Sequence, residues 1–170
     1  MLIRGYDFKV ITPEPFDFVQ AVTKNHFFFV RQNGLWGTLD TTGKYLAKCQ
    51  FKTVLSPSEE YFLVQHENGN YGYLDPRGKL QVTPDYQTLD NFKNGLAIAS
   101  KGENQVGLIN KFNAKILPFT FKEIKFSDTT KEYVVTDIDE NRFTLNQQGE
   151  CTQNCKDLEA IRIKANSVQK

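Results

Sequence analysis

The sequence lacks the features that mark nucleic-acid-binding, membrane-spanning and secreted proteins. Its 21 basic and 20 acidic residues leave a formal net charge of +1, without the basic stripe that displaces counterions from phosphates. No apolar run approaches the roughly 18 residues of a membrane-spanning helix. The first residues, MLIRGYDFKVITPEPF, contain no basic stretch followed by an apolar one, as a signal peptide would. We therefore expect a cytoplasmic protein that binds neither nucleic acid nor membrane.

Cysteine is scarce, with an odd count of three: Cys49, Cys151 and Cys155. This count favours thiols in a reducing compartment over a disulfide framework. A structural zinc site needs four ligands, usually in two closely spaced pairs, and the sequence has one pair at poor spacing. We expect no metal and no cofactor.

Histidine is scarcer still, which limits catalysis to His26 and His66. Nucleophilic catalysis needs a serine or cysteine, a histidine base and an orienting third group. We expect His26 to pack in the core and His66 to be solvated beside a turn. The sequence thus predicts no catalytic residue and no enzyme. A deep pocket that gathers Asp, Glu or His from different copies of the repeat would reverse that expectation.

The chain instead contains a repeat with a period of about 35 residues, which is typical of repeat architectures. Corresponding pairs are Trp36-Gly37, Tyr71-Gly72 and Val106-Gly107, with Arg142-Phe143 in the same place of a fourth copy. The units run over about 1–25 (partial), 26–60, 61–95, 96–132 and 133–170. Because no linker separates them, we expect a single domain over 1–170.

Each copy has the pattern of short strands joined by tight turns. One four-residue turn recurs with Asp or Asn first and Gly or Asn last, as Asp40–Gly43, Asp75–Gly78, Asn110–Asn113 and Asn146–Gly149. An Asp or Asn side chain caps such a turn, and the last residue accepts a positive φ. A turn-capping role is therefore favoured over acid–base chemistry for Asp40 and Asp75.

Side-chain alternation along a strand predicts which positions form the core. The glycines of the Trp-Gly pairs share a face with Leu39, Leu74, Ile109 and Leu145, so we expect this face to be buried and the Trp36 position to be partly exposed. Aromatic and aliphatic pairs should fill the space between hairpins: Phe16/Val19, Phe51/Val54, Tyr86/Leu89, Phe121/Ile124 and, last, Leu158/Ile161.

These patterns predict an all-β fold of tandem β-hairpin repeats in an antiparallel meander or solenoid-like array. A closed, five-unit toroid resembling a propeller is the alternative. For the tail, 156–170, strand is slightly favoured over helix.

The string Phe92–Ala97, together with Tyr71–Asp75, Gly78-Lys79 and Pro84–Tyr86, resembles the bacterial WG repeat, also called the KWG repeat. Its pattern is roughly F-x-x-G-L-A-x-V, then W-G-Y-I-D-x-x-G-K, then I-x-P-x-Y. The match is good over 27–121 and weak over 133–165. The resemblance implies a bacterial β-repeat array that serves in binding, and it implies no catalytic residues.

Departures from the repeat indicate candidate binding residues. Asp137, Asp139 and Glu140 lie in an acidic loop, Glu59 and Glu60 lie in the divergent segment 56–60, and 127–132 enlarges the same corner in a later copy. We expect these loops to gather along one rim. Solvated loop drift is the alternative.

Aromatic side chains supply the other candidates, Phe27, Trp36 and Tyr71, with Phe62 and Tyr73 beside them in the pattern. Cross-strand packing is the first interpretation, and a stacking platform for a sugar or peptide is the second. The functional hypothesis is a non-enzymatic protein-binding module, in one version an immunity or antitoxin-type protein that masks a toxin. A module that binds a glycan or small ligand is the alternative.

Overall fold

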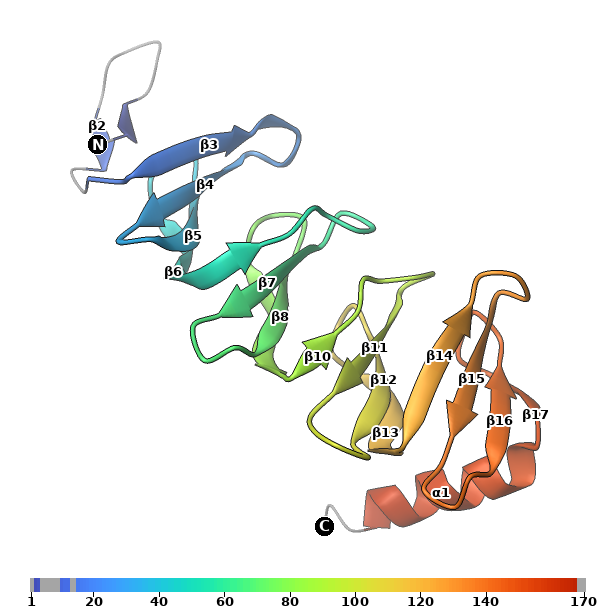
Figure 1. Ribbon diagram of the computed structural model, residues 1–170. Coiled ribbons are helices and arrows are strands. Elements are labelled where there is room, and N and C mark those ends of the chain that lie inside the picture. Colours follow the sequence, from blue (N-terminus) through green and yellow to red (C-terminus); the bar gives the residue numbers. More distant parts are fainter. Residues whose placement is uncertain (1, 4–9, 13–14, 168–170) are drawn as a thin grey trace. The chain divides into compact units, whose positions relative to one another are not determined.

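The computed structural model describes residues 2–3, 10–12 and 15–167, with side chains over 15–22 and 24–163. Strands dominate these residues (Figure 1). In chain order they are β1 Leu2–Ile3, β2 Val10–Thr12, β3 Phe18–Val22, β4 Phe27–Gln32, β5 Leu35–Asp40, β6 Tyr45–Val54, β7 Phe62–His66, β8 Tyr71–Leu74, β9 Leu80–Tyr86, β10 Thr88–Leu89, β11 Leu96–Ser100, β12 Val106–Asn110, β13 Lys115–Phe121, β14 Glu123–Ser127, β15 Glu132–Thr136, β16 Arg142–Leu145 and β17 Cys151–Gln153. A 3-10 turn covers Thr23–Asn25, and the helix α1 covers Cys155–Ser167.

The predicted array of antiparallel hairpins is confirmed. Within each sheet the strands follow one another in sequence order, and none of the sheets in the described part of the chain closes on itself. The chain divides into two compact units, residues 1–84 and 85–170. A single domain over the whole chain stays a prediction.

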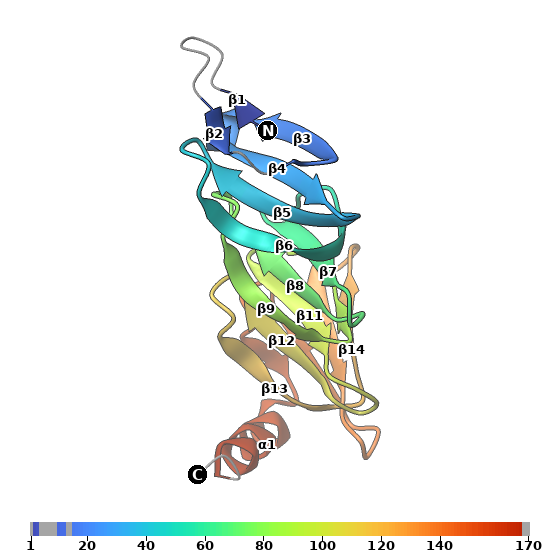
Figure 2. The same cartoon turned by 90° about the vertical axis from the view of Figure 1, so that its left-hand side faces the viewer.

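The first unit contains one seven-stranded sheet in the order β3-β4-β5-β6-β7-β8-β9, which Figure 2 shows from the side. Strand β6 is ten residues long and connects two successive copies of the repeat. Its Phe51 pairs with Trp36 of β5 in one copy, and its Val54 pairs with Val64 of β7 in the next. One strand therefore pairs with β5 of one copy and with β7 of the next. This sharing explains why no linker separates the copies.

The second unit contains two four-stranded sheets, β10–β13 and β14–β17, followed by α1. The preference for a strand in the tail is wrong, because 155–167 form a helix. Lys156, Leu158, Glu159 and Ala160 are strong helix formers. Leu158 is fully buried and Ile161 packs against the same core, as the predicted pair should. Their spacing of three places them on one face of a helix.

The recurring turns form as predicted. Asp40 Oδ1 accepts hydrogen bonds from the backbone N–H of Thr42 and Lys44, at 2.8 and 3.0 Å. Asp75 makes the same pair of contacts with Arg77 and Lys79. The last residues of the four turns, Gly43, Gly78, Asn113 and Gly149, all have positive φ, between 61° and 87°. The carboxylates of Asp40 and Asp75 thus cap turns.

The predicted core face is confirmed, since Leu39, Leu74, Ile109 and Leu145 are all fully buried. Glycine is needed at Gly37 and Gly72, on the same face, because the backbone of a neighbouring strand approaches closely there. A Cβ on Gly72 would lie 2.3 Å from the carbonyl oxygen of Val82, and one on Gly37 would lie 2.7 Å from the backbone nitrogen of Cys49. The opposite face is also buried in places, because Thr38, Tyr73 and Leu108 have no exposure.

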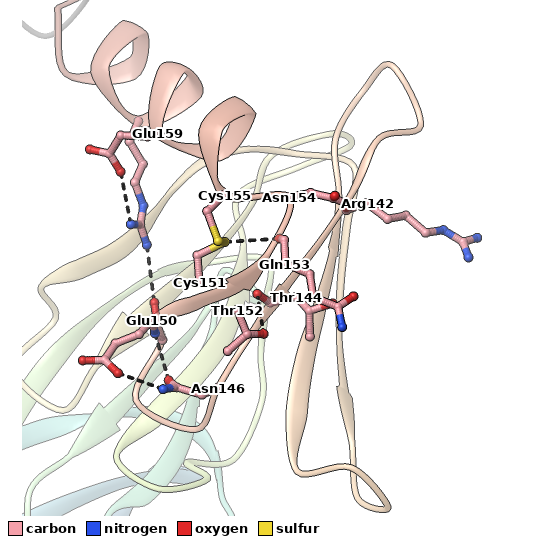
Figure 3. Close-up of a disulfide and its surroundings, with 12 residues drawn as sticks. Arg142, Thr144, Asn146, Glu150, Cys151, Thr152, Gln153, Asn154, Cys155 and Glu159 are labelled. Atoms are coloured by element: carbon pink, nitrogen blue, oxygen red, sulfur yellow. Dashed lines mark hydrogen bonds and ion pairs between the residues drawn. A yellow bond between two sulfur atoms is a disulfide. The ribbon is translucent and has the colours of Figure 1, made fainter.

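The two C-terminal cysteines, Cys151 and Cys155, differ from the expectation that they are thiols. Cys151 at the start of β17 and Cys155 at the start of α1 form a disulfide, with their Cα atoms 5.6 Å apart (Figure 3). The expectation of thiols at these two positions is therefore wrong. The turn from β17 into the helix brings the two side chains together, and their Cα separation lies within the usual disulfide range. Cys49 is not part of a disulfide.

Candidate binding grooves

The acidic loop that was predicted as a binding site is in part a structural turn. Asp137 is 6% exposed, and its Oδ1 accepts hydrogen bonds from the backbone N–H of Asp139 and Asn141 at 2.9 and 2.8 Å. Its Oδ2 accepts another from Asn141 Nδ2. This carboxylate repeats the capping pattern of Asp40 and is not available to a partner.

The other two acidic residues of this loop, Asp139 and Glu140, are exposed. Glu140 pairs with Lys122, and the hydrogen bond and negative charge of Glu140 raise the pKa of that lysine. Glu140 also has a positive φ of 66°. These two side chains remain open to solvent at the tip of a hairpin.

The prediction that the divergent loops lie along one rim is wrong for the two loops of the second unit. The enlarged turn 128–131 precedes β15, and the acidic turn 137–141 follows it. The two turns therefore lie at opposite ends of the same strand (Figure 1). Because a strand of five residues is about 16 Å long, the two loops form no common surface.

Glu59 and Glu60 occupy the two central positions of a tight turn in the first unit, with φ of 48° and 72°. Both residues are exposed, and Glu60 Oε1 lies 2.8 Å from Lys24 Nζ. This hydrogen bond and the charge of Glu60 raise the pKa of Lys24. An exposed ion pair of this kind adds little to stability.

The aromatic candidates divide into core residues and partly accessible ones. Phe27, Phe62 and Tyr73 are 2%, 8% and 0% exposed, which leaves them no surface for stacking on a sugar. Trp36 and Tyr71 are half-buried, as predicted for their position in the repeat. The predicted platform is therefore reduced to single rings, and cross-strand packing explains most of the aromatic pattern.

Neither histidine lines the two grooves of this structure that are described in the next paragraphs. His26 is exposed, so its predicted packing in the core is wrong. It takes a left-handed φ of 56° at the end of the 3-10 turn, and Phe27 fills the core instead. His66 is half-buried, and its Nδ1 accepts a hydrogen bond from the N–H of Asn68 at 3.3 Å, which stabilises a turn.

A groove of about 460 Å³ lies in the first unit between two successive copies of the repeat. We call it the Trp36 groove. One wall comes from β3 and the other from the end of β6 and the segment after it. It is lined by Gln20, Ala21, Val22, Lys24, Phe29, Trp36, Val54, Leu55, Ser56, Pro57 and Phe62. Lys24 is the one charged residue of this lining, so the groove is predominantly apolar.

Exposed hydrophobic side chains continue the groove onto the surface. Phe18 on β3 is 47% exposed, and Leu55 after β6 is 45% exposed. The ring of Phe18 meets that of Trp36 edge-on, with centroids 5.5 Å apart. The register explains this contact, because Phe18 pairs with Arg31 and Arg31 pairs with Trp36 across three neighbouring strands.

The Arg31 guanidinium lies 5.8 Å from the Trp36 ring centroid. Arg31 is exposed, so the contact is open to water. A cation over an indole ring in such a place contributes modestly. The tryptophan is thus held between an aromatic edge and a cation, with part of its surface facing the groove.

An equivalent groove of about 500 Å³ recurs two repeats further along, in the second unit. We call it the Lys93 groove. It is lined by Asp90, Asn91, Lys93, Leu96, Ile98, Ile124, Lys125, Phe126 and Tyr133. Asp90 and Asn91 take the places of Gln20 and Ala21, and Lys125 takes the place of Leu55. The same fold therefore presents a more polar groove here.

Lys93 contacts both an acid and a ring in this second groove. Its Nζ lies 3.2 Å from Asp128 and 4.5 Å from the centroid of Phe126. The Tyr133 hydroxyl donates to the Lys93 carbonyl oxygen at 3.1 Å. Burial raises the pKa of Asp90, against the opposing effect of Lys93.

Sequence reasoning missed both grooves, although the repeat contains the signal for them. The two walls of a groove come from strands of two successive copies, so the residues that face each other are far apart in the sequence. Ala21 and Leu55, for example, are separated by 34 positions. Comparison of equivalent positions two copies apart would have found the change from Leu55 to Lys125. Among the described residues, no helix has the length and apolar character to span a membrane.

Several solved structures are similar to this chain at low identity. The computationally designed Ika8 protein is 14% identical, with 79% of this chain and 47% of that chain covered and a TM-score of 0.38. PorZ, a surface component of the type-IX secretion system of Porphyromonas gingivalis, is 14% identical, with coverage of 72% and 20% and a TM-score of 0.37. The extracellular domain of the putative hybrid two-component system BT3049 from B. thetaiotaomicron is 15% identical, with coverage of 79% and 21% and a TM-score of 0.34. This chain spans less than half the length of each.

No relative among curated proteins matches the chain. The family described as the WG containing repeat matches residues 36–71 and again residues 71–104. These two matches begin at Trp36-Gly37 and Tyr71-Gly72, the pairs that carry the resemblance in the sequence. They meet at Tyr71 without a gap, and the first match contains the whole of the shared strand β6. Residues 36–104 therefore match the WG containing repeat twice in succession, which confirms the resemblance found in the sequence.

Proposed function

We propose that this chain is a non-enzymatic binding module for another protein and that the Trp36 groove of the first unit receives that partner. The observation that carries the proposal is the apolar lining of this groove and its continuation into exposed Phe18 and Leu55. Exposed contiguous apolar surface on a water-soluble domain is typical of interaction sites. Aromatic anchors such as Trp36 are the residues on which protein interfaces most depend.

The arrangement of titratable groups favours binding over catalysis. The carboxylates of Asp40, Asp75 and Asp137 cap turns, and His66 accepts a turn hydrogen bond. The Trp36 groove contains neither a carboxylate nor an imidazole in its lining. Its one lysine, Lys24, is exposed and has a raised pKa, whereas a lysine that acts as a general base needs a lowered one.

One specific version is an immunity or antitoxin-type protein whose partner is a toxin. The support for it is limited to the open groove of a small repeat domain and to exposed Asp139 and Glu140, which suit a basic partner surface. The disulfide between Cys151 and Cys155 removes the cysteine-based argument for a cytoplasmic location. The location therefore rests on the sequence-based expectation alone.

The proposal is tested by affinity capture from the native host with three immobilised forms of the full chain. The wild type should retain a stoichiometric partner, and Leu55→Glu should lose it, because a carboxylate would enter the apolar groove. Phe112→Glu is the matched control, since Phe112 is 77% exposed but lies in the second unit. Capture of no stoichiometric partner, or equal loss from both variants, would count against the groove as the binding site.

A further inference from the structure

Strand β3 is an unusually unprotected sheet edge. The larger sheets in the described part of the chain have six edge strands: β3, β9, β10, β13, β14 and β17. β9 and β13 contain Pro84 and Pro118, and β14 carries Glu123 and Lys125. β10 and β17 are two and three residues long. Charges, prolines and short length are the usual devices that stop an edge from pairing with another chain.

None of these devices is present in β3, whose sequence is FVQAV. It pairs with β4 over all five residues, from Phe18↔Arg31 to Val22↔Phe27, without a bulge. Three of its side chains are exposed and the other two are half-buried. Figures 1 and 2 show β3 at the end of its sheet, with β4 on one side. Within the described residues, no strand pairs with its other edge, which could therefore accept one more strand.

The sequence of β3 is complementary to itself. In an antiparallel pair centred on Gln20, Phe18 of each copy lies opposite Val22 of the other, and Val19 lies opposite Ala21. Gln20 then lies opposite its own counterpart. Opposed apolar side chains stabilise a strand pair, and β3 contains no charge that would meet a like charge. Both the protruding ring and the small side chains that receive it therefore come from the same five residues.

We propose that a second copy of this chain pairs antiparallel along the open edge of β3 and joins two seven-stranded sheets. Phe18 of the partner subunit then lies opposite Val22, at the wall of the Trp36 groove that β3 supplies. The partner copy thus contributes a side chain to the mouth of this groove. This inference does not depend on the proposed function, because the groove opens on the face of the sheet and the pairing uses its edge.

Absence of charge is the argument for a second copy over a strand of another protein. The strand that offers the edge consists of Phe18, Val19, Gln20, Ala21 and Val22, none of which is charged. An uncharged strand is therefore the complementary partner, and β3 itself is such a strand. A ladder of five residues is short, so we expect a dissociation constant of roughly 1–100 µM.

The test uses the full chain in sedimentation velocity between about 5 and 500 µM. The wild type should form dimers with increasing concentration. Gln20→Lys and Gln20→Glu should each weaken the dimer about tenfold or more, because each places like charges opposite each other. An equimolar mixture of the two variants should restore dimers, since an ammonium group of one subunit would then face a carboxylate of the other. Recovery on mixing distinguishes pairing through β3 from loss of folding.

Thr120→Lys is the matched control, because Thr120 is an exposed residue of the edge strand β13. It should leave the dimer unchanged. A wild type that stays monomeric over the whole range overturns the proposal. In that case protection of those β3 amides that point away from β4 would show that another part of the same chain covers the edge. A dimer that persists in both Gln20 variants also overturns it.

Discussion

Ser58 and Tyr61 exchange two backbone hydrogen bonds, of 3.0 and 2.9 Å, across Glu59 and Glu60. The next copy contains the same exchange between Lys93 and Leu96, with Asn94 and Gly95 at the centre. Both central residues have positive φ in each turn. Asn-Gly is suited to this conformation, whereas glutamate is not.

The double variant Glu59→Asn/Glu60→Gly should therefore be more stable than the wild type by about 1–2 kcal/mol, because it relieves left-handed backbone strain. Urea unfolding monitored by tryptophan fluorescence measures the difference. Glu59→Gln/Glu60→Gln is the control, since it removes the charges and keeps the strain. If the control gains as much stability, charge and not backbone conformation is the cause.

Gly72→Ala should destabilise the first unit by about 3 kcal/mol, because the new Cβ would overlap backbone atoms that side-chain rotation cannot move. Its distances would be 2.3 Å to the Val82 carbonyl oxygen and 3.0 Å to the Pro84 nitrogen. Gly102→Ala is the matched control, with no neighbouring atom closer than 3.8 Å. That change should stay within about 0.5 kcal/mol. Thermal unfolding of the two variants measures both effects. Equal shifts of the two midpoints would contradict the role of Gly72 in strand packing.

Asp40 should make stability depend on pH in the acid range. Burial alone would raise its pKa, but hydrogen bonds from Thr42 and Lys44 outweigh this effect and lower the pKa. A carboxylate whose pKa is lower in the folded than in the unfolded state stabilises the fold at pH values above the unfolded pKa. This stabilisation is lost as the pH falls through the folded pKa.

Relative to Asp40→Asn, the wild type should therefore lose unfolding free energy as the pH falls below about 4. The difference between the two proteins in urea unfolding from neutral to acid pH isolates Asp40 from the other carboxylates. Asparagine keeps the capping oxygen, as Asn110 and Asn146 do in later copies. A difference that is constant with pH would show that the carboxylate charge has no part in the cap.

Reduction of the Cys151–Cys155 disulfide should lower the unfolding free energy by about 2 kcal/mol, because the closed loop is short. Without reductant, the denatured chain should contain one titratable thiol, that of Cys49. With reductant it should contain all three. Three thiols in the unreduced chain would refute the disulfide and restore the sequence-based expectation.

The period of the sequence was sufficient to predict the array, the turns and much of the core. Trp36-Gly37 and Tyr71-Gly72 mark equivalent strands, and Asp40 and Asp75 cap equivalent turns. This success has a simple cause. Each copy imposes the same constraint at the same position, so comparison of copies separates packing and turn residues from variable ones.

The tail and the disulfide were not predicted, because they lie where the repeat ends. Leu158 and Ile161 were correctly placed against the core, but a spacing of three does not by itself distinguish a helix from an irregular segment. The odd count of cysteines favoured thiols, whereas the turn into α1 placed two of them side by side.

The two candidate grooves were not predicted from the sequence. The acidic residues drew attention because they depart from the repeat, but Asp137 departs from it to cap a turn. The Trp36 groove combines residues from two copies, and no property of a single copy reveals it. Trp36 itself was a correct candidate for partial exposure, since its strand face is only half covered.

The continuity of β6 through two copies determines where this chain can be divided or lengthened. A cut at residue 60, between two sequence repeats, would separate β6 from β7, although Val54 pairs with Val64 across that point. A cut at the Gly69 turn would in the same way separate β7 from β8, which pair from Phe62↔Leu74 to Gln65↔Tyr71. Lengthened or duplicated forms of this chain should therefore gain a whole period at a time, so that each strand equivalent to β6 keeps a partner in both copies.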